Sequence, residues 1–403
     1  MSDSDPSSSP SRSPTPARAA PAPPRLPHDV LTRIARFLTV DTGEDPHDTL
    51  EDRQKDALSM ARVCKAWRAA GTVARWREIE VELNTSRALL KHVEAHRSLS
   101  QHVQSVMINL GVYTWGVYMG ETRSTVPSIL ANCPRLCRLE FIGGRLAVPG
   151  PLFQALQDKV DLSRLTTVVV TWGRETHTWS GARDPSVLSP LLLFTFLRKC
   201  TNLRSFAFDV WGDLIRNPAP GPPDRRFKLA SLRLDIKNPA DDEAQIYTLN
   251  MRMRFLANFN LAHLTQFTGA GLFTHKDWWI AFDQMRNLES LKLRADFALK
   301  TGGLDELSSR LPRLVSLARF DLRPVGPCGP RDEGAPTVVE LQRLLNALPR
   351  SLEEADVWLP IPESVVDRFL DAGMRTKFRR FQVFVYDPLD RAATSVLQRY
   401  SRP

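Results

Sequence analysis

Two histidines four residues apart, in the segment TSRALLKHVEAHRSL, have the type and spacing of a metal-binding pair. His92 and His96 would lie on one face of a helix, where two imidazole nitrogens can share a zinc ion. The segment lacks the HExxH sequence, and the chain offers no matched third ligand, so a solvated helix face explains both side chains better. The sequence therefore predicts no metal site and no cofactor.

The other candidates for chemistry are also incomplete. Cys133 and Cys137 in NCPRLCRLEF have the wrong spacing for a zinc knuckle. The Gly-Gly pairs at positions 143 and 302 are isolated turn signals and do not form a GxxxxGK phosphate loop. No two carboxylates are placed so that a raised pKa can be argued. We therefore expect a protein that is not an enzyme.

The composition is that of an ordinary globular protein. The chain has 403 residues, 42% of them hydrophobic, which is enough for two domains or one long repeat array. The longest apolar run, from Val187 to Leu197, is too short to cross a bilayer of about 30 Å. Residues 1–25 lack the apolar core of a secretory signal, and the five cysteines are odd in number. These features predict a cytoplasmic or nuclear protein with no membrane partner.

The formal charge of +9 is compatible with an acidic partner or with nucleic acid. However, the arginines are spread over every segment, and no block of five or six basic residues occurs. No stripe of basic residues alternates with stacking aromatics either. The sequence thus disfavours nucleic acid as a partner, although retention on heparin or DNA would test that alternative.

The first 78 residues divide into a tail and a helical segment. Residues 1–25 are rich in Ser and Pro and predict a disordered tail. From Leu26 to Leu38 apolar residues recur at helical spacing, and they recur again at three-residue intervals from Leu58 to Trp67. Short helices over about fifty residues bury too little surface to be stable alone. The apolar face of this segment is therefore predicted to dock on a partner.

The order of residues in this segment resembles the F-box. The similarity consists of a Leu-Pro opening at Leu26-Pro27, an apolar helix, a Val-Cys-x-x-Trp helix from Val63 to Trp67, and a distal Trp76. It covers residues 26–77, and the segment from Thr39 to Ala57 is longer than is usual in the family. The resemblance implies docking on a Skp-type adaptor, which a cullin scaffold holds. The implied docking residues are Leu26, Pro27, Val30, Leu31, Ile34, Phe37, Leu38, Leu58, Val63, Cys64, Trp67 and Trp76.

A phrase of three apolar residues, with the pattern of Leu136, Leu139 and Phe141, recurs through the remainder of the chain. Most phrases follow a helical pattern, so strand and helix alternate. Stacking of such units predicts a curved α/β solenoid over residues 79–403, with parallel strands inside and helices outside. An ordinary α/β domain with a parallel sheet remains the alternative. The phrases begin at Val103, Leu136, Leu165, Leu203, Leu229, Leu264, Leu288, Leu317, Leu352 and Phe378.

These units resemble degenerate leucine-rich repeats, which would make the chain similar to fungal-type F-box proteins with such repeats. The Asn or Cys that is typical after the third apolar position is mostly absent, and the unit at Leu264 has a weak third position. Side-chain alternation places the intervening residues on the concave wall, where charges concentrate in the C-terminal half. The predicted substrate-binding residues are Arg233, Asp235, Lys292, Arg294, Arg319, Asp321, Arg323, Glu354, Asp356, Trp358 and Arg380.

The resemblance implies a substrate-recognition adaptor of a Skp-cullin-F-box ubiquitin ligase, in which the solenoid binds a protein substrate. One alternative is a Skp-binding scaffold or signalling protein that does not deliver substrates. Another is an enzyme hidden in a compact α/β domain, for which a deep pocket with convergent polar groups would be the discriminating observation.

Overall fold

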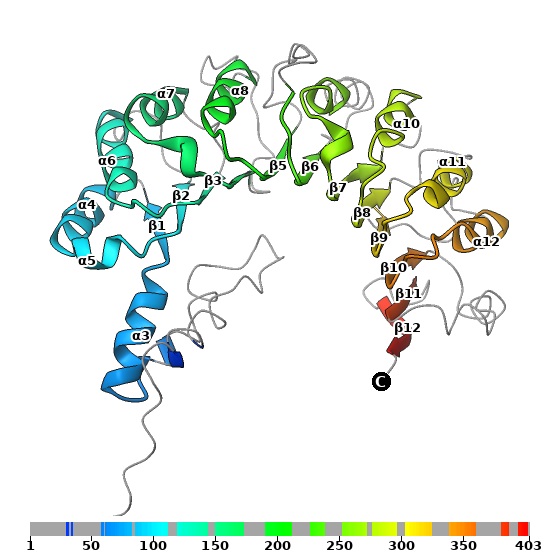
Figure 1. Cartoon of the computed structure of the whole chain (residues 1–403), viewed down its shortest axis with the longest axis horizontal. Coiled ribbons are helices and arrows are strands. Elements are labelled where there is room, and N and C mark those ends of the chain that lie inside the picture. Colours follow the sequence, from blue (N-terminus) through cyan, green and yellow to red (C-terminus); the bar gives the residue numbers. More distant parts are fainter. Residues whose placement is uncertain are drawn as a thin grey trace, which may run out of the picture.

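A computed structural model gives the structure of the chain, which is an open arc with strands on its inner edge and helices on its outer edge (Figure 1). It describes residues 30, 31, 34, 58, 59, 61–82, 85–111, 119–143, 150–172, 190–211, 226–237, 252–271, 276–295, 303–324, 338–359, 380–386 and 394–401. Predictions for residues 1–25 lie outside this set.

The described strands form one continuous sheet in chain order, as expected when each unit packs only on its neighbours. Pairing is parallel from β1 through β11 and antiparallel between β11 and β12. The strands are β1 Glu78–Glu82, β2 Ser105–Gly111, β3 Arg138–Gly143, β4 Thr167–Trp172, β5 Ser205–Trp211, β6 Ser231–Lys237, β7 Gln266–Gly271, β8 Ser290–Ala295, β9 Arg319–Pro324, β10 Glu354–Leu359, β11 Arg380–Tyr386 and β12 Thr394–Ser401.

The helices alternate with these strands, and those from α4 onward cover the outer face of the sheet (Figure 1). They are α3 Lys65–Arg75, α4 Ser86–Ala95, α5 Arg97–Ser100, α6 Met119–Ala131, α7 Gly150–Lys159, α8 Pro190–Lys199, α10 Lys276–Phe282, α11 Gly303–Arg310 and α12 Val338–Asn346, with 3-10 turns η1 Leu162–Arg164, η4 Leu261–His263 and η5 Leu311–Arg313. Among the described helices, none has both the length and the apolar character needed to cross a bilayer.

The predicted apolar phrases form the core between the sheet and the helices. In the unit of β3, Leu136, Leu139 and Phe141 are all buried, because alternate side chains of a strand face the same side. Aromatic rings fill the wider spaces: Phe141 stacks on Phe153 of α7 with 4.9 Å between ring centroids. The parallel, curved and open α/β arrangement predicted from the sequence is thus confirmed, and the compact alternative is not observed.

The weak third position of the unit at Leu264 is Gly269, and the structure explains it. The ring of Phe267 turns into the space that a third apolar side chain occupies in the other units. A Cβ at position 269 would lie 2.9 Å from the Phe267 ring and 2.8 Å from the carbonyl oxygen of Leu234. Glycine is therefore required here for close approach of the backbone.

Polar side chains link several of the turns before strands to the turn of the preceding unit. The side-chain amide of Asn202 donates to the carbonyl of Ser163 at 2.8 Å, and that of Asn287 donates to the carbonyl of Ala262 at 2.8 Å. The hydroxyl of Thr265 donates to the carbonyl of Ala230 at 3.2 Å. In these units the linking side chains lie next to the first apolar position, directly before it at Asn202 and Asn287 and directly after it at Thr265.

Two strands were not predicted from the sequence. β1 precedes the first predicted phrase, and its EIEVE sequence pairs in register with β2. β12 pairs antiparallel with β11, so the last strand reverses the direction of the sheet. The solenoid thus begins one strand earlier than the phrase pattern indicates and ends on a strand of a different kind.

Candidate functional site: a helical docking module and a concave wall

The described residues of the N-terminal helical module form a core cluster of their own. Leu31 is 1% exposed and packs in one cluster with Ala70 and Ala74, and Trp67 packs against this cluster. The cluster is separate from the continuous core of the solenoid. In Figure 1, α3 extends away from the arc and does not lie on its outer helix layer. The module is therefore joined to the solenoid without sharing its interior.

The predicted docking residues divide into three groups. Val30, Leu31, Ile34 and Leu58 are helical, and Leu31 belongs to the core of the module. Val63 and Cys64 lie at the start of α3 and face solvent, with Val63 66% exposed. The residues that lie outside the described set are Leu26, Pro27, Phe37 and Leu38. Val63 is thus an exposed apolar side chain next to the core cluster of this module.

Trp76 lies where the module meets the solenoid. Its ring packs against the solenoid core and stacks on the ring of His92, with 5.3 Å between centroids. His92 in turn lies 4.4 Å from the ring of His96, whose Nδ1 lies 3.0 Å from the carbonyl oxygen of His92. His92 and His96, the pair with metal-binding spacing, thus stack with Trp76 at the junction between the helical module and the solenoid. Both histidines are exposed, as the sequence predicted for a solvated helix face, but their contact with Trp76 was not predicted.

Strand register places the predicted substrate residues in three parallel rows on the inner side of the arc. One row contains Arg233, Lys292, Asp321 and Asp356, a second contains Asp235, Arg294 and Arg323, and the third contains Arg319, Glu354 and Arg380. Backbone register puts Trp358 beside Phe384 and Arg380 beside Glu354, but the side chains of Trp358 and Arg380 lie outside the described set. The rows bring together residues that are far apart in the sequence.

Within these rows, arginine side chains cover carboxylates of the same wall. Arg294 Nη1 donates to Asp235 Oδ2 at 2.7 Å, and the Arg294 side chain is 47% exposed against 9% for Asp235. Arg323 pairs with Asp321 at 2.9 Å, with 51% and 14% exposed. Arg233 pairs with Asp209 and Arg319 pairs with Glu354, and in both pairs the arginine side chain is more exposed than the carboxylate. Each carboxylate orients a guanidinium group that a partner can reach.

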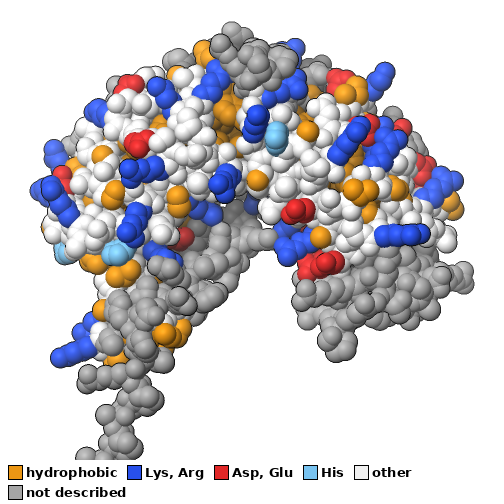
Figure 2. Space-filling model, in the orientation of Figure 1, with side chains coloured by type: hydrophobic (Ala, Val, Ile, Leu, Met, Phe, Trp, Pro, Cys, Tyr) orange, Lys and Arg blue, Asp and Glu red, His pale blue; other side chains and the backbone are white. Residues whose placement is uncertain are grey.

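The acidic partner of Arg233 is Asp209, which the predicted site did not include. Asp209 Oδ2 lies 3.8 Å from Arg233 Nη2, and Asp209 aligns with Asp235 on the neighbouring strand. The signal that points to Asp209 is its position six residues after the first apolar residue, which is the same offset as that of Asp235 and Arg294. Figure 2 shows acidic and basic side chains next to one another on the inner rim of the arc.

The thiols of the solenoid are structural. Burial raises the pKa of Cys133 and that of Cys200 to about 12, so both thiols are neutral near neutral pH. Each donates to a backbone carbonyl one turn earlier in its helix, at Ile129 and Phe196. Over the described residues, no group of three His, Cys, Asp or Glu side chains is placed to hold a metal ion.

The fold and the two surfaces together define a curved α/β solenoid that carries a small helical module at its N-terminal end. In comparisons with known proteins, no family model matches the chain and no curated protein matches it.

Proposed function

We propose that this chain is a substrate-recognition adaptor of a Skp-cullin-F-box ubiquitin ligase. In this proposal the N-terminal module docks on a Skp-type adaptor, and the concave wall holds a protein substrate. The observation that carries the proposal is the separate core of the module, made of Leu31, Ala70 and Ala74, beside the exposed Val63. A helical segment of about fifty residues buries too little apolar area to be stable alone, so a partner surface supplies the remainder.

The concave wall supports the second half of the proposal. Its paired arginines are held by carboxylates beneath them, so their guanidinium groups lose little freedom when a substrate binds. Concave faces of solenoids commonly bind other polypeptides. Such an adaptor performs no bond chemistry and acts by raising the concentration of a substrate near a transferring enzyme.

The test is affinity purification of the full chain from cells, followed by identification of the proteins that are retained. A Val63→Glu variant places a charge on the proposed docking surface. The matched control is Val315→Glu, because Val315 is 73% exposed and lies on a solenoid turn. We expect the wild type and the control to retain a Skp-type adaptor and a cullin, and Val63→Glu to lose both.

Retention of the adaptor by Val63→Glu as strongly as by the control would contradict the docking surface. Retention of the adaptor without a cullin by the wild type would favour the alternative of a Skp-binding scaffold that delivers no substrate.

A further inference from the structure

The middle of the solenoid carries six basic side chains that the sequence scatters over three units. They form what is here named the basic patch: Arg198, Lys199, Arg204, Arg226, Lys228 and Arg254. Arg226 is half-buried and the other five are exposed. Arg204, Arg226 and Lys228 lie before β5 and β6, and stacking brings such turns to one side of the sheet. Arg198, at the end of α8, lines one pocket with Arg226 and Lys228, and Arg254 lines another with Arg226. Figure 2 shows basic side chains along such a face of the arc.

No carboxylate neutralises this patch among the described residues of its three units. The stretches 190–211, 226–237 and 252–271 contain two acidic residues, Asp209 and Asp235, and both are buried on the concave wall. Some basic residues elsewhere on the outer surface do have acidic partners: Arg313, for example, lies 3.4 Å from Asp283. The contrast shows that the patch concentrates positive charge and is not an average solvated surface.

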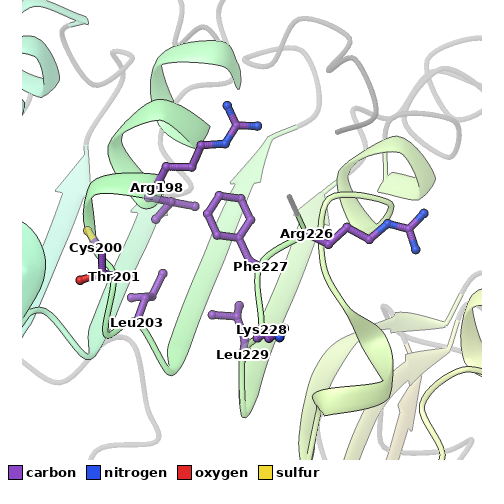
Figure 3. A pocket seen from close by; sticks show the side chains of 9 residues that line it. Arg198, Cys200, Thr201, Leu203, Arg226, Phe227, Lys228 and Leu229 are labelled. Carbon is purple, nitrogen blue, oxygen red and sulfur yellow. The ribbon is translucent and has the colours of Figure 1, made fainter. Parts of the chain in front are cut away.

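A pocket of about 330 Å³ opens within the patch (Figure 3). Arg198 from the end of α8 and Arg226 from the neighbouring unit lie on either side of Phe227, and Leu203 and Leu229 form an apolar floor. The Nε of Arg226 is buried and has no hydrogen-bond partner among the described residues. Because the buried thiol of Cys200 is neutral, it adds no negative charge to this pocket.

A second pocket of about 290 Å³ shares Arg226 with the first. Arg254 also lines it, together with Met253, Phe259, Ile280 and one carboxylate, that of Asp277 in α10. The two pockets are small and share Arg226, so they fit an extended chain that alternates acidic and apolar side chains. Each is at or below the lower end of the roughly 300 to 1,000 Å³ that small-molecule sites occupy, which favours single side chains over a cofactor.

We propose that the basic patch binds an extended acidic segment of a partner protein, whose apolar side chains enter these two pockets. Nucleic acid fits less well, because no described residue of the patch offers an exposed aromatic ring on which bases could stack. The ring of Phe227 is half-buried and packs against Phe194 and Phe259, with centroids 6.0 and 5.7 Å apart. This surface is separate from the concave wall and does not depend on the docking module.

The test uses the full chain and fluorescein-labelled peptides of about twelve residues, a length that spans neighbouring units. One peptide alternates Glu with Leu, a second carries phosphoserine in place of Glu, and a third carries Gln. The patch variant is Arg198→Glu, Arg226→Glu, Lys228→Glu. The control makes the same change of charge at Lys91, Arg97 and Arg135, which are exposed near the N-terminal end of the arc.

Fluorescence anisotropy should show that the Glu or the phosphoserine peptide binds the wild type and the control alike. The patch variant should bind at least about tenfold more weakly, and the Gln peptide should bind as weakly to all three proteins. The stronger of the two acidic peptides identifies carboxylate or phosphate as the source of the charge. Thermal unfolding and retention of the Skp-type adaptor check that the patch variant is folded.

Three results would overturn the proposal. The first is failure of both acidic peptides to bind the wild type, and the second is an equal loss of binding in the patch variant and the control. The third is displacement of the peptide by a single-stranded DNA oligonucleotide that binds more tightly, which would assign the patch to nucleic acid.

Discussion

Substitution of Gly269 by alanine tests the packing of the solenoid, because it changes the free energy of unfolding in two opposite ways. The unfolded chain becomes less flexible, which stabilises the protein, and the folded chain becomes crowded, which destabilises it. At a position with free space, Gly→Ala stabilises a protein by about 0.4 to 1 kcal/mol through the unfolded chain. Here the added Cβ would lie 2.8 Å from the carbonyl oxygen of Leu234, which is fixed in the sheet beside it. Overpacking of this kind costs about 1 to 3 kcal/mol, so we expect a net destabilisation of roughly 1 to 2 kcal/mol.

Urea titration followed by circular dichroism measures this effect as a lower midpoint at unchanged slope. Adding Phe267→Leu removes the ring from one of the two close contacts, so the cost of Gly269→Ala should be smaller in that background. Thr268→Ala, one residue earlier on the same strand, is the control and should change stability by about 0.5 kcal/mol or less. A Gly269→Ala protein that is as stable as the wild type would refute the reasoning.

Two further predictions concern the turns and the thiols. Asn202→Ala removes the side-chain bond to the carbonyl of Ser163 and should cost about 1 kcal/mol, whereas Thr201→Ala beside it should cost less in the same urea titration. Cys133 and Cys200 have a pKa raised from 9.0 to about 12, so their contribution to stability is complete below about pH 9 and is lost as the pH rises toward 12. The difference in unfolding free energy between the wild type and a Cys133→Ala, Cys200→Ala variant should therefore shrink between about pH 8 and pH 11, and a constant difference would contradict the assignment.

The strands and the core could be predicted from the sequence because the spacing of apolar residues encodes both. Leu136, Leu139 and Phe141 have one pattern that sets the strand, its register and its buried face together. Position 269 escaped this reasoning, since glycine carries no apolar signal and the compensating ring of Phe267 is visible only in three dimensions. β12 was not predicted either, because the spacing of apolar residues does not report that the last strand pairs antiparallel with β11.

The candidate surfaces were predictable to different degrees. Alternation along the strands placed Asp235 and Arg294 on the concave wall, but their ion pair joins strands two positions apart in the sheet, which periodicity does not report. The basic patch was missed because a search for contiguous basic blocks cannot find residues such as Arg198 and Arg254, which only stacking brings near each other. Trp76 was predicted as a docking residue, whereas its stack on His92 depends on how the first helix of the solenoid packs.

The reversed direction of β12 also bears on self-association. A solenoid whose two terminal strands run the same way presents matching edges, so copies could join head to tail into a filament that never closes. The antiparallel final strand presents the opposite backbone direction from the rest of the sheet, and another copy cannot continue the repeat there in the same register. The antiparallel β12 therefore disfavours head-to-tail polymerisation at this edge of the sheet.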